Sequence, residues 1–440
     1  MTSSFECDEQ TIHDLEIFKE KGQSSIFNLF NKTFSAGGRS YLKLLMEHPL
    51  DDLKELEKRQ DLIQYFIERP PVLKTFSTHV NFIEKYIHLN YSVLKANPLD
   101  ANLLRLTEWF NPTNEYYLVR SGCESIIHIL HELHAQLDYG SLPEGLEAFT
   151  SLQQLLYAEV RKQVDPQAKL SWKQLIRLDR LFRKQHKDKL AGFLQEIYLL
   201  DAYLSIAKTA KEEGFCLAHY VSTEQPIYKA DGLWHPLLEA PISNNMELDQ
   251  EENMCFLTGP NMAGKSTFLK SVGLAVYLAH LGFPIPAKTF HTSVYSTMIT
   301  TINLTDNMGA GYSHFYSEVR RVKQAAQALA TGKRVFVIFD ELFRGTNVKD
   351  AFEASAEIIK AFAQVENCTF FVSTHILEVA DELQENERVS FKCFHSDLIE
   401  GKLKYTYQLQ EGVSSERIGK FIVEKEGILE LLDTIKKPFV

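Results

Sequence analysis

The sequence predicts an α + α/β protein in two parts, an all-helical module over residues 1–215 and an α/β domain over residues 216–440. Three observations predict this division. In the first part, apolar residues recur at steps of three and four, which is the period of an amphipathic helix. After Cys216, short apolar runs alternate with helical patterns, as in a parallel sheet covered by helices. One apolar run ends in a loop with two glycines and continues as a helix.

Prolines separate the predicted helices of the first part. Proline ends a helix because it has no backbone N–H to donate and its ring clashes with the preceding turn. The candidate boundaries are Pro49, Pro70, Pro71, Pro98, Pro112, Pro143 and Pro166. Gly37 and Gly38 interrupt one helical pattern, so we expect a tight turn or a close contact between helices there.

Three runs of the second part are apolar throughout, which predicts strands buried on both faces of a sheet. They are residues 254–257, 335–339 and 369–373. Helical patterns lie between them, at residues 265–281, 317–330 and 350–363. From residue 402 to the end we expect a strand at residues 403–409, followed by one or two short helices.

The composition is that of a soluble globular protein, with 45% apolar and 24% charged residues. The six cysteines form no Cys-x-x-Cys pair, which favours a reducing compartment over a disulfide framework or a zinc site. The N-terminus is polar and acidic, unlike a secretory signal, and the longest apolar run, residues 272–281, is too short to cross a membrane. We therefore expect a cytoplasmic protein without membrane contact. The net charge of −11 argues against a uniformly basic surface.

The loop after the first buried strand has the pattern Gly-x-x-x-x-Gly-Lys-Ser. Its glycines let the backbone turn several N–H groups toward one anion, and the following helix adds the positive end of its dipole. Lys265 can reach the β- and γ-phosphates of a nucleotide, and the Ser266 hydroxyl can bind Mg2+. The expected ATP-binding residues are Gly259, Pro260, Asn261, Met262, Ala263, Gly264, Lys265, Ser266 and Thr267. A glycine-rich turn without a ligand is the alternative.

Two carboxylates follow the second buried strand, and a histidine follows the third. Asp340 stands at the strand end, where it can bind Mg2+ together with Ser266. Glu341 can act as the general base that activates water. His375 could touch the γ-phosphate or the attacking water, so Lys265, Glu341 and His375 form the predicted catalytic set. The alternatives are carboxylates that cap the next segment and a structural histidine.

Residues 161–190 carry ten basic side chains against three aspartates in an otherwise acidic chain. Arg177, Arg180, Lys184 and Lys187 follow one another at steps of three or four, so one face of a helix would be basic. Contact with the phosphate backbone of a nucleic acid is one interpretation. A solvated helix face that pairs with acidic neighbours is the other.

Several motifs together resemble the MutS family of DNA mismatch-repair ATPases, which are of the ABC type. The motifs are the loop at residues 259–267, Asp340 and Glu341 with the segment to residue 350, Ser373-Thr-His375, and residues 311–318 with Ser313. The resemblance implies a P-loop (ABC-type) α/β ATPase domain that binds ATP and Mg2+. It also implies a homodimer through the ATPase domains, in which Ser313 would reach the partner's γ-phosphate.

The resemblance extends on both sides of these motifs. His235, in a His-Pro element, and Asn244, in a loop near the nucleotide, match family positions that bind the cofactor. Residues 11–18 look like the opening of the family's core domain, and residues 197–214 resemble its long lever helix. The first part would therefore be a helical core and lever module that precedes the ATPase domain.

The chain departs from the family members that find mismatches. Those members have two further domains before the core, one of them with a Phe-x-Glu reader, whereas this chain starts at the core opening. Phe5-Glu6-Cys7 is not such a reader, and Ala263 replaces a glycine that is usual in the family's loop. The chain is therefore expected to be a short member that lacks the mismatch-reading and connector domains.

The resemblance implies a dimeric, nucleotide-gated switch that hydrolyses ATP and binds duplex or branched DNA in repair or recombination. DNA would contact the helical module, including residues 161–190. The absent reader and the acidic net charge favour an alternative, an ATP-gated scaffold or regulator that binds proteins and not DNA. A nucleotide kinase that uses the same loop is a third hypothesis.

Overall fold

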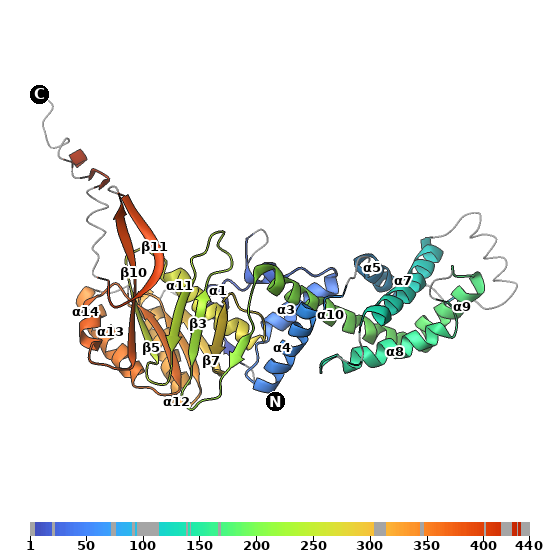
Figure 1. Cartoon of the computed structure of the whole chain (residues 1–440), viewed down its shortest axis with the longest axis horizontal. Coiled ribbons are helices and arrows are strands. Elements are labelled where there is room, and N and C mark those ends of the chain that lie inside the picture. Colours follow the sequence, from blue (N-terminus) through green and yellow to red (C-terminus); the bar gives the residue numbers. More distant parts are fainter. Residues whose placement is uncertain are drawn as a thin grey trace, which may run out of the picture. The chain divides into compact units, whose positions relative to one another are not determined.

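The structure is a computed structural model of the chain. It describes residues 5–19, 23–71, 76–89, 93–94, 114–137, 140, 142–165, 169–302, 314–343, 347–399, 402–414, 425–428 and 430–432. The chain divides into two compact units (Figure 1). The sheet unit comprises Met1–Ile26, Pro49–Leu56 and Gly214–Val440, and the helical unit comprises Phe27–His48 and Glu57–Glu213.

A seven-stranded sheet forms the centre of the sheet unit (Figure 1). In spatial order its strands are β1 (Glu6–Cys7), β7 (Thr297–Thr301), β8 (Val335–Phe339), β9 (Cys368–Ser373), β5 (Met254–Thr258), β10 (Val389–Ile399) and β11 (Lys402–Glu411). All neighbouring pairs are parallel except β10 and β11. Every residue of β5, β8 and β9 is buried, as their uninterrupted apolar runs predict.

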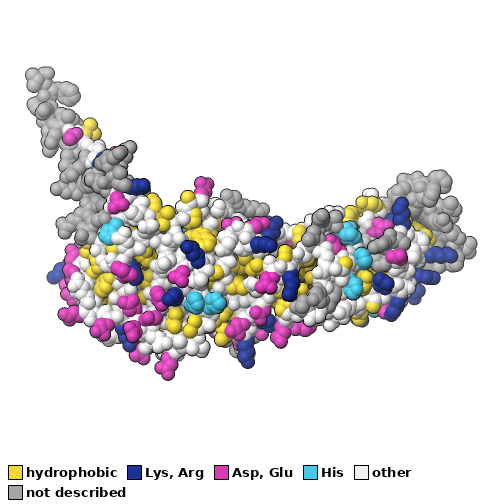
Figure 2. Space-filling view, in the orientation of Figure 1, with side chains coloured by type: hydrophobic (Ala, Val, Ile, Leu, Met, Phe, Trp, Pro, Cys, Tyr) yellow, Lys and Arg dark blue, Asp and Glu magenta, His cyan; other side chains and the backbone are white. Residues whose placement is uncertain are grey.

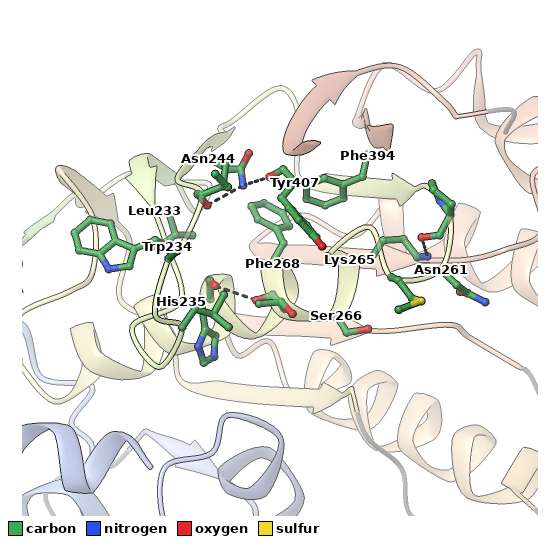
Figure 3. Close-up of a pocket in the computed structure, with 18 of the residues that line it drawn as sticks. Leu233, Trp234, His235, Asn244, Asn261, Lys265, Ser266, Phe268, Phe394 and Tyr407 are labelled. Atoms are coloured by element: carbon green, nitrogen blue, oxygen red, sulfur yellow. Dashed lines mark hydrogen bonds between the residues drawn. The ribbon is translucent and has the colours of Figure 1, made fainter. Parts of the chain in front are cut away.

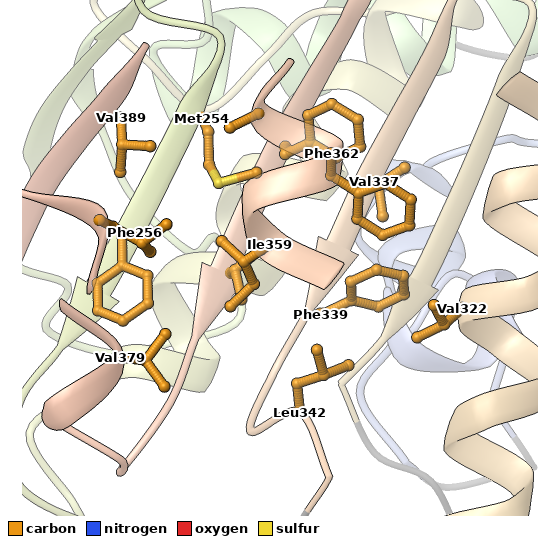
Figure 4. Packing of buried hydrophobic residues seen from close by; sticks show 14 of the residues in the cluster. Met254, Phe256, Val322, Val337, Phe339, Leu342, Ile359, Phe362, Val379 and Val389 are labelled. Atoms are coloured by element: carbon orange, nitrogen blue, oxygen red, sulfur yellow. The ribbon is translucent and has the colours of Figure 1, made fainter. Parts of the chain in front are cut away.

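Helices follow the strands and cover the sheet. They are α11 (Lys265–His280), α12 (His314–Ala330), α13 (Val348–Ala363) and α14 (Glu378–Leu383). One apolar cluster joins α12, α13 and α14 to the central strands, with Phe339, Ile359 and Phe362 packed together (Figure 4). The ring of Phe362 stacks on that of Phe370, with centroids 5.2 Å apart. Because β5, β8 and β9 are parallel, their carboxyl ends meet at one edge of the sheet.

The sequence does not predict the second sheet of this unit. Its four strands, in spatial order, are β2 (Ala218–Tyr220), β6 (Thr289–Thr292), β3 (Tyr228–Leu233) and β4 (Asn244–Leu248). These strands mix polar and apolar residues, so they lack the continuous apolar runs of the central strands. Strand β4 contacts β11, which brings the second sheet against the edge of the first.

The first 26 residues belong to the sheet unit, whereas the sequence assigns them to the helical module. Strand β1 pairs in parallel with β7, Glu6 opposite Thr297, and α1 (Glu9–Asp14) packs on β7. The segment Pro49–Leu56 belongs to the sheet unit as well. A strand of two residues and a helix of six are too short to produce a readable period, which explains the difference.

The described part of the helical unit contains helices and no strand. They are α3 (Ala36–Glu47), α5 (Phe76–Ile87), α7 (Asn114–Gln136), α8 (Glu147–Arg161), α9 (Trp172–Arg180), a π-helical turn η1 (Leu181–Gln185) and α10 (Lys187–Glu213). Two further helices, α2 (Ile26–Phe30) and α4 (Leu53–Glu68), cross into it from the sheet unit. Helix α10 is long and apolar enough to cross a membrane, but 61% of its most apolar window is buried in the fold. It packs as the core helix of this unit.

Gly37 and Gly38 bring α3 into close contact with α10. A Cβ atom on Gly37 would lie 2.3 Å from the ring of Tyr198, and one on Gly38 would lie 2.0 Å from Asp201 Oδ2. Asp201 accepts hydrogen bonds from the backbone N–H groups of Phe34 at 3.0 Å and Ser35 at 2.9 Å. Of the two structures that the sequence allows here, close packing between helices is the one observed.

We expect Gly38→Ala to destabilise the protein by about 1–3 kcal/mol, because the added methyl group displaces the buried Asp201 carboxylate. Thermal unfolding measures the effect. Gly192→Ala is the matched control, because the same substitution in α10 places the methyl at an ordinary 3.4 Å from Leu152. The control should be neutral or slightly stabilising. Equal unfolding temperatures for the two variants would contradict the packing described here.

Candidate functional site

The loop between β5 and α11 turns on two glycines. Gly259 has φ 141° and Gly264 has φ 102°, values that residues with a side chain rarely adopt. A Cβ atom on Gly259 would lie 2.9 Å from the backbone oxygen of Phe394. Met262, with φ 67°, is 77% exposed. The loop therefore leaves β5 in a tight curve and leads directly into α11 at Lys265.

Lys265 lies within this curve. Its ammonium group donates to the backbone oxygens of Gly259 at 2.8 Å and Pro260 at 3.1 Å, and the residue is only 5% exposed. The N-terminal end of α11 adds the partial positive charge of unpaired backbone N–H groups. A buried cation beside a helix N-terminus attracts an anion, and phosphate is the anion that such loops bind.

Asp340 lies beside the first turn of α11, although it follows β8 in the chain. Its carboxylate accepts hydrogen bonds from the hydroxyl of Ser266 at 2.5 Å and from the hydroxyl of Ser373, the last residue of β9. Its backbone N–H donates to the oxygen of Thr301 at 2.8 Å. Burial raises the pKa of Asp340 above its ordinary value. The carboxyl ends of β7, β8 and β9 thus meet at the start of α11.

Glu341 and His375 form a pair at the same edge of the sheet. His375 Nε2 lies 2.5 Å from Glu341 Oε1. The backbone N–H of Glu341 donates to both the backbone oxygen and the hydroxyl of Ser373, at 3.0 and 3.1 Å. Glu341 has φ 57°, a conformation that costs energy for a residue with a side chain and that is concentrated at functional sites. Such a pair can move a proton between a carboxylate and an imidazole.

A cavity of about 470 Å³ extends from the loop along α11 (Figure 3). Lys265, Ser266 and Glu341 are among the polar residues that line it. Its other lining residues include the aromatic Phe268, Phe394 and Tyr407 and the apolar Leu233, Trp234 and Ile242. The cavity therefore combines a cation and hydroxyls with aromatic and apolar side chains.

Asn244 fixes β11 beside the cavity. Its side-chain nitrogen donates to the backbone oxygen of Tyr407 at 3.1 Å (Figure 3). Its side-chain oxygen accepts from the N–H of Leu409 at 2.7 Å. Tyr407 has φ 55° and interrupts the regular course of the strand. Asn244 lines the cavity from the first position of β4, not from a loop, and its amide holds the strand that carries Tyr407.

His235 also lines the cavity and is 6% exposed. Neither ring nitrogen has a hydrogen-bond partner among the described residues. Burial lowers the pKa of His235 to about 4, so its imidazole is neutral near pH 7. A neutral imidazole carries one N–H donor and one nitrogen acceptor, both of which are available to a ligand here.

Comparison with known proteins finds relatives of the sheet unit. The model of MutS domain V matches residues 255–433, which include the loop and Asp340, Glu341 and His375. This match supports membership of the MutS family. The DNA mismatch repair protein MutS of Anaplasma phagocytophilum is 30% identical over 223 residues, 50% of this chain and 27% of the relative. The MutS of Leuconostoc citreum is 30% identical over 260 residues, 57% and 29% of the two chains.

A plant protein is similar to this chain over about the same length. The DNA mismatch repair protein MSH6 of Arabidopsis thaliana is 28% identical over 263 residues, which are 56% of this chain and 20% of that protein. In all three comparisons, the chain spans less than a third of the length of the MutS-family relative that it matches.

The structure places most of the predicted site residues at one cavity or at the sheet edge beside it. Ser313 and the segment 344–346 lie outside the described residues. Ser373, which closes the apolar run before His375, is a site residue that no sequence pattern indicates. Tyr407 and Phe394 are not predicted as cavity residues either, because only the order of strands in the sheet brings β10 and β11 beside the loop.

One of the ten basic residues of the stretch 161–190 lies outside the predicted basic face and is buried. The side chain of Arg183 is only 7% exposed, and its Nε donates to Asp179 at 2.6 Å. Arg177, Arg180 and Lys184 are exposed, as is Lys187, and none of them forms an ion pair with an acidic side chain of the described residues. Figure 2 shows dark blue Lys and Arg side chains gathered over this end of the helical unit.

Proposed function

We propose that this MutS-family chain binds and hydrolyses ATP with Mg2+, and that it acts as a dimeric, nucleotide-gated switch on DNA in repair or recombination. One observation carries the proposal. The Ser266 hydroxyl and the Asp340 carboxylate meet beside a phosphate-type loop, and the Glu341–His375 pair lies next to them. A site for binding alone would not need a carboxylate and an imidazole at this place.

The polar residues of the site have separate roles in this proposal. The backbone N–H groups of residues 259–267 and the Lys265 ammonium would bind the phosphates, after Lys265 exchanges its present bonds to Gly259 and Pro260. Ser266 and Asp340 supply a hydroxyl and a carboxylate, the oxygen ligands that Mg2+ prefers. Bound Mg2+ would neutralise charge on the phosphate oxygens.

Glu341 is the proposed general base. Its carboxylate would accept the proton of the attacking water, and His375 would orient that water or stabilise the charge that develops on the γ-phosphate. The strained backbone of Glu341, with φ 57°, keeps its side chain toward the cavity. Both residues are bonded or adjacent to Ser373, so one strand end aligns them.

The aromatic lining of the cavity fits a nucleotide base. Tyr407 and Phe394 offer aromatic faces for stacking, and His235 offers two unpaired ring nitrogens to polar atoms of the nucleotide. Asn244 supports this lining by holding Tyr407 in place. These features support ATP as the ligand over a simple phosphate ion, which would need only the loop.

The proposed homodimer would pair two sheet units. Met262 at 77%, Leu238 at 49% and Ile242 at 45% exposure surround the cavity with apolar side chains that a second subunit would cover. Ser313 is proposed to reach the partner's γ-phosphate, and this role rests on the resemblance of residues 311–318 to the family's segment. ATP would then be part of the interface, so its hydrolysis would open the dimer.

Phosphate release from ATP by the purified chain tests the enzymatic part of the proposal. We expect release that depends on Mg2+ and stops when the metal is chelated. Absence of ATP binding by the wild-type chain would refute the proposed function.

The proposed DNA contact uses the exposed basic residues of α9 and η1. The triple variant Arg177→Glu, Arg180→Glu, Lys184→Glu should bind duplex or branched DNA far more weakly than the wild type. Each lost phosphate contact lowers the slope of log affinity against log salt by about 0.9, so the slope should fall by about 3. Fluorescence anisotropy at several salt concentrations measures both quantities.

The control for this prediction has the same change in net charge. Lys43, Arg69 and Lys211 are exposed residues at separate places in the helical unit, and reversing all three to Glu should change the slope by much less. Equal losses in both variants would mean that only net charge matters. No binding of any DNA form by the wild type at low salt would favour the alternative, an ATP-gated scaffold for proteins, which the net charge of −11 supports.

A further inference from the structure

The N-terminal segment, residues 5–19 and 23–26, is built into the sheet unit (Figure 1). The ring of Phe5 is buried and stacks on His280 at the end of α11, with centroids 3.7 Å apart. β1 extends the central sheet, and α1 packs on β7. After residue 26, the same chain continues into the helical unit.

Asp14 anchors this segment to the end of β7. Its carboxylate is fully buried, and Oδ2 accepts the hydroxyl of Thr300 at 2.7 Å and the N–H of Ile302 at 2.9 Å. The other oxygen accepts Gln10 Nε2 at 2.8 Å. Between the two bonded residues stands Thr301, whose oxygen receives the backbone N–H of Asp340. Asp14 therefore holds the strand end that sets the position of Asp340.

Arg321 of α12 supports the same strand end. Its guanidinium donates to the backbone oxygen of Thr300 at 2.5 Å and forms an ion pair with Asp8 of the N-terminal segment. The backbone N–H of Thr300 donates to the hydroxyl of Thr11 at 3.2 Å. Three side chains of the segment thus converge on Thr300 and its neighbours.

Glu16 forms a second anchor, two residues after Asp14. Lys270 of α11 lies 2.8 Å from Glu16 Oε1, and both side chains are largely buried, at 16% and 20% exposure. Lys270 stands one helical turn after Ser266, on the helix that begins at the loop. Glu16 has φ 55°, and its backbone oxygen accepts the N–H of Ile26 at 3.1 Å. The segment therefore holds α11 as well as β7.

These two anchors reach the two sides of the proposed magnesium site. Ser266 lies on α11, which Glu16 holds through Lys270. Asp340 directly follows β8, and its backbone N–H is bonded to the end of β7, which Asp14 holds. The hydrogen bond from Ser266 to Asp340 requires the two elements to keep a fixed separation. One short stretch of chain, Asp14 to Glu16, is bonded to both.

We propose that Asp14 and Glu16 are positioning residues that keep Ser266 and Asp340 close enough to bind one Mg2+ together. Neither residue lines the cavity, so they act through β7 and α11 and do not touch the nucleotide. The inference rests on the proposed ATPase function. A segment that only stabilises the fold would not change the metal dependence of nucleotide binding, and this difference can be measured.

Asp14→Asn is the sharpest test. An asparagine is neutral and has one acceptor oxygen in place of two, so the charge-assisted hydrogen bonds that Asp14 accepts from Thr300 and Ile302 become weaker. We expect ATP affinity without metal to stay within twofold of the wild type. The Mg2+ concentration that gives half of the metal-dependent gain in ATP affinity should rise at least fivefold. Equilibrium binding of a fluorescent ATP analogue, titrated with Mg2+, gives both values.

Asp201→Asn is the matched control. Asp201 is also a buried aspartate that accepts two backbone N–H groups and a hydroxyl, but it lies in the helical unit. It should leave the Mg2+ midpoint within twofold. Glu16→Gln provides a second variant at a partly exposed position, should Asp14→Asn fail to fold, and it should raise the midpoint at least threefold.

Hydrogen exchange supplies a readout without metal or nucleotide. In Asp14→Asn or Glu16→Gln, the amide of Asp340 should exchange at least tenfold faster than in the wild type, because its bond to Thr301 loosens. A wild-type chain that binds no ATP would refute the proposed function. A wild type that binds Mg2+ and ATP normally, with Mg2+ midpoints of both variants equal to that of Asp201→Asn, would overturn the positioning role alone.

Discussion

Replacing Glu341 by Gln should lower ATP turnover by about two to four orders of magnitude while ATP binding is retained. Glutamine preserves the size of the side chain and an acceptor for His375, but it cannot accept the proton of water. The loop, Lys265 and the Ser266–Asp340 pair are unchanged, so the nucleotide should still bind. Phosphate release at saturating ATP and equilibrium binding of ATP measure the two effects separately.

The control for this prediction is Glu378→Gln, which removes an exposed carboxylate of α14 only three residues from His375. Its turnover should equal that of the wild type. Normal turnover by Glu341→Gln would remove Glu341 from the role of general base. A loss of ATP binding together with turnover would indicate that Glu341 contributes to the shape of the cavity instead.

Replacing Asp340 by Asn should abolish the effect of Mg2+ on ATP binding, because the site loses its anionic ligand. The apo protein should be at least as stable as the wild type near pH 7. Burial raises the pKa of Asp340 in the folded state, so the stability that this shift contributes is present at low pH and is lost as pH rises through the folded-state pKa. The neutral amide does not suffer that loss. Thermal unfolding with and without Mg2+ and ATP measures both effects.

Asp381→Asn removes an exposed carboxylate from the same unit and should change neither property. Stabilisation of Asp340→Asn by ATP should be the same with Mg2+ as with a chelator. A variant that keeps the wild-type gain from Mg2+ would show that the metal has other ligands and that Asp340 has a structural role.

The central strands could be predicted because a strand that is buried on both faces leaves an uninterrupted apolar run in the sequence. β5, β8 and β9 are buried on both faces, so every position is apolar. β1 and β3 could not be predicted in this way. β1 has two residues, and β3 includes Lys229, Asp231 and Gly232, because its pairing with β4 and β6 requires no continuous apolar run.

The polar residues of the site could be predicted from their positions in the chain, because each of them directly follows a strand or starts a helix. Asp340 and Glu341 follow β8, and Lys265 starts α11. The contributions of Tyr407, Asn244 and Asp14 depend on pairing between segments that are distant in the chain. Asp14 reaches Ile302 across 288 positions, and no periodicity in the sequence indicates such a contact.

In the helical unit, the sequence also does not reveal which basic residues of the stretch 161–190 are buried against an acidic partner. Composition alone counts Arg183 among the ten basic residues of residues 161–190, but the structure pairs it with the buried Asp179. Asp179 also accepts the hydroxyl of Tyr86 at 2.9 Å and the N–H of Leu94 at 2.8 Å. A charge that satisfies a buried partner is therefore not available to a nucleic acid.

Sedimentation velocity of Glu341→Gln tests most directly the central claim that ATP switches the chain between two states. With ATP and Mg2+, the variant should sediment as a dimer, because the nucleotide completes the interface and is not hydrolysed. With ADP, it should sediment as a monomer. The same sedimentation coefficient under both conditions, with ATP binding verified, would contradict the proposed nucleotide-gated switch.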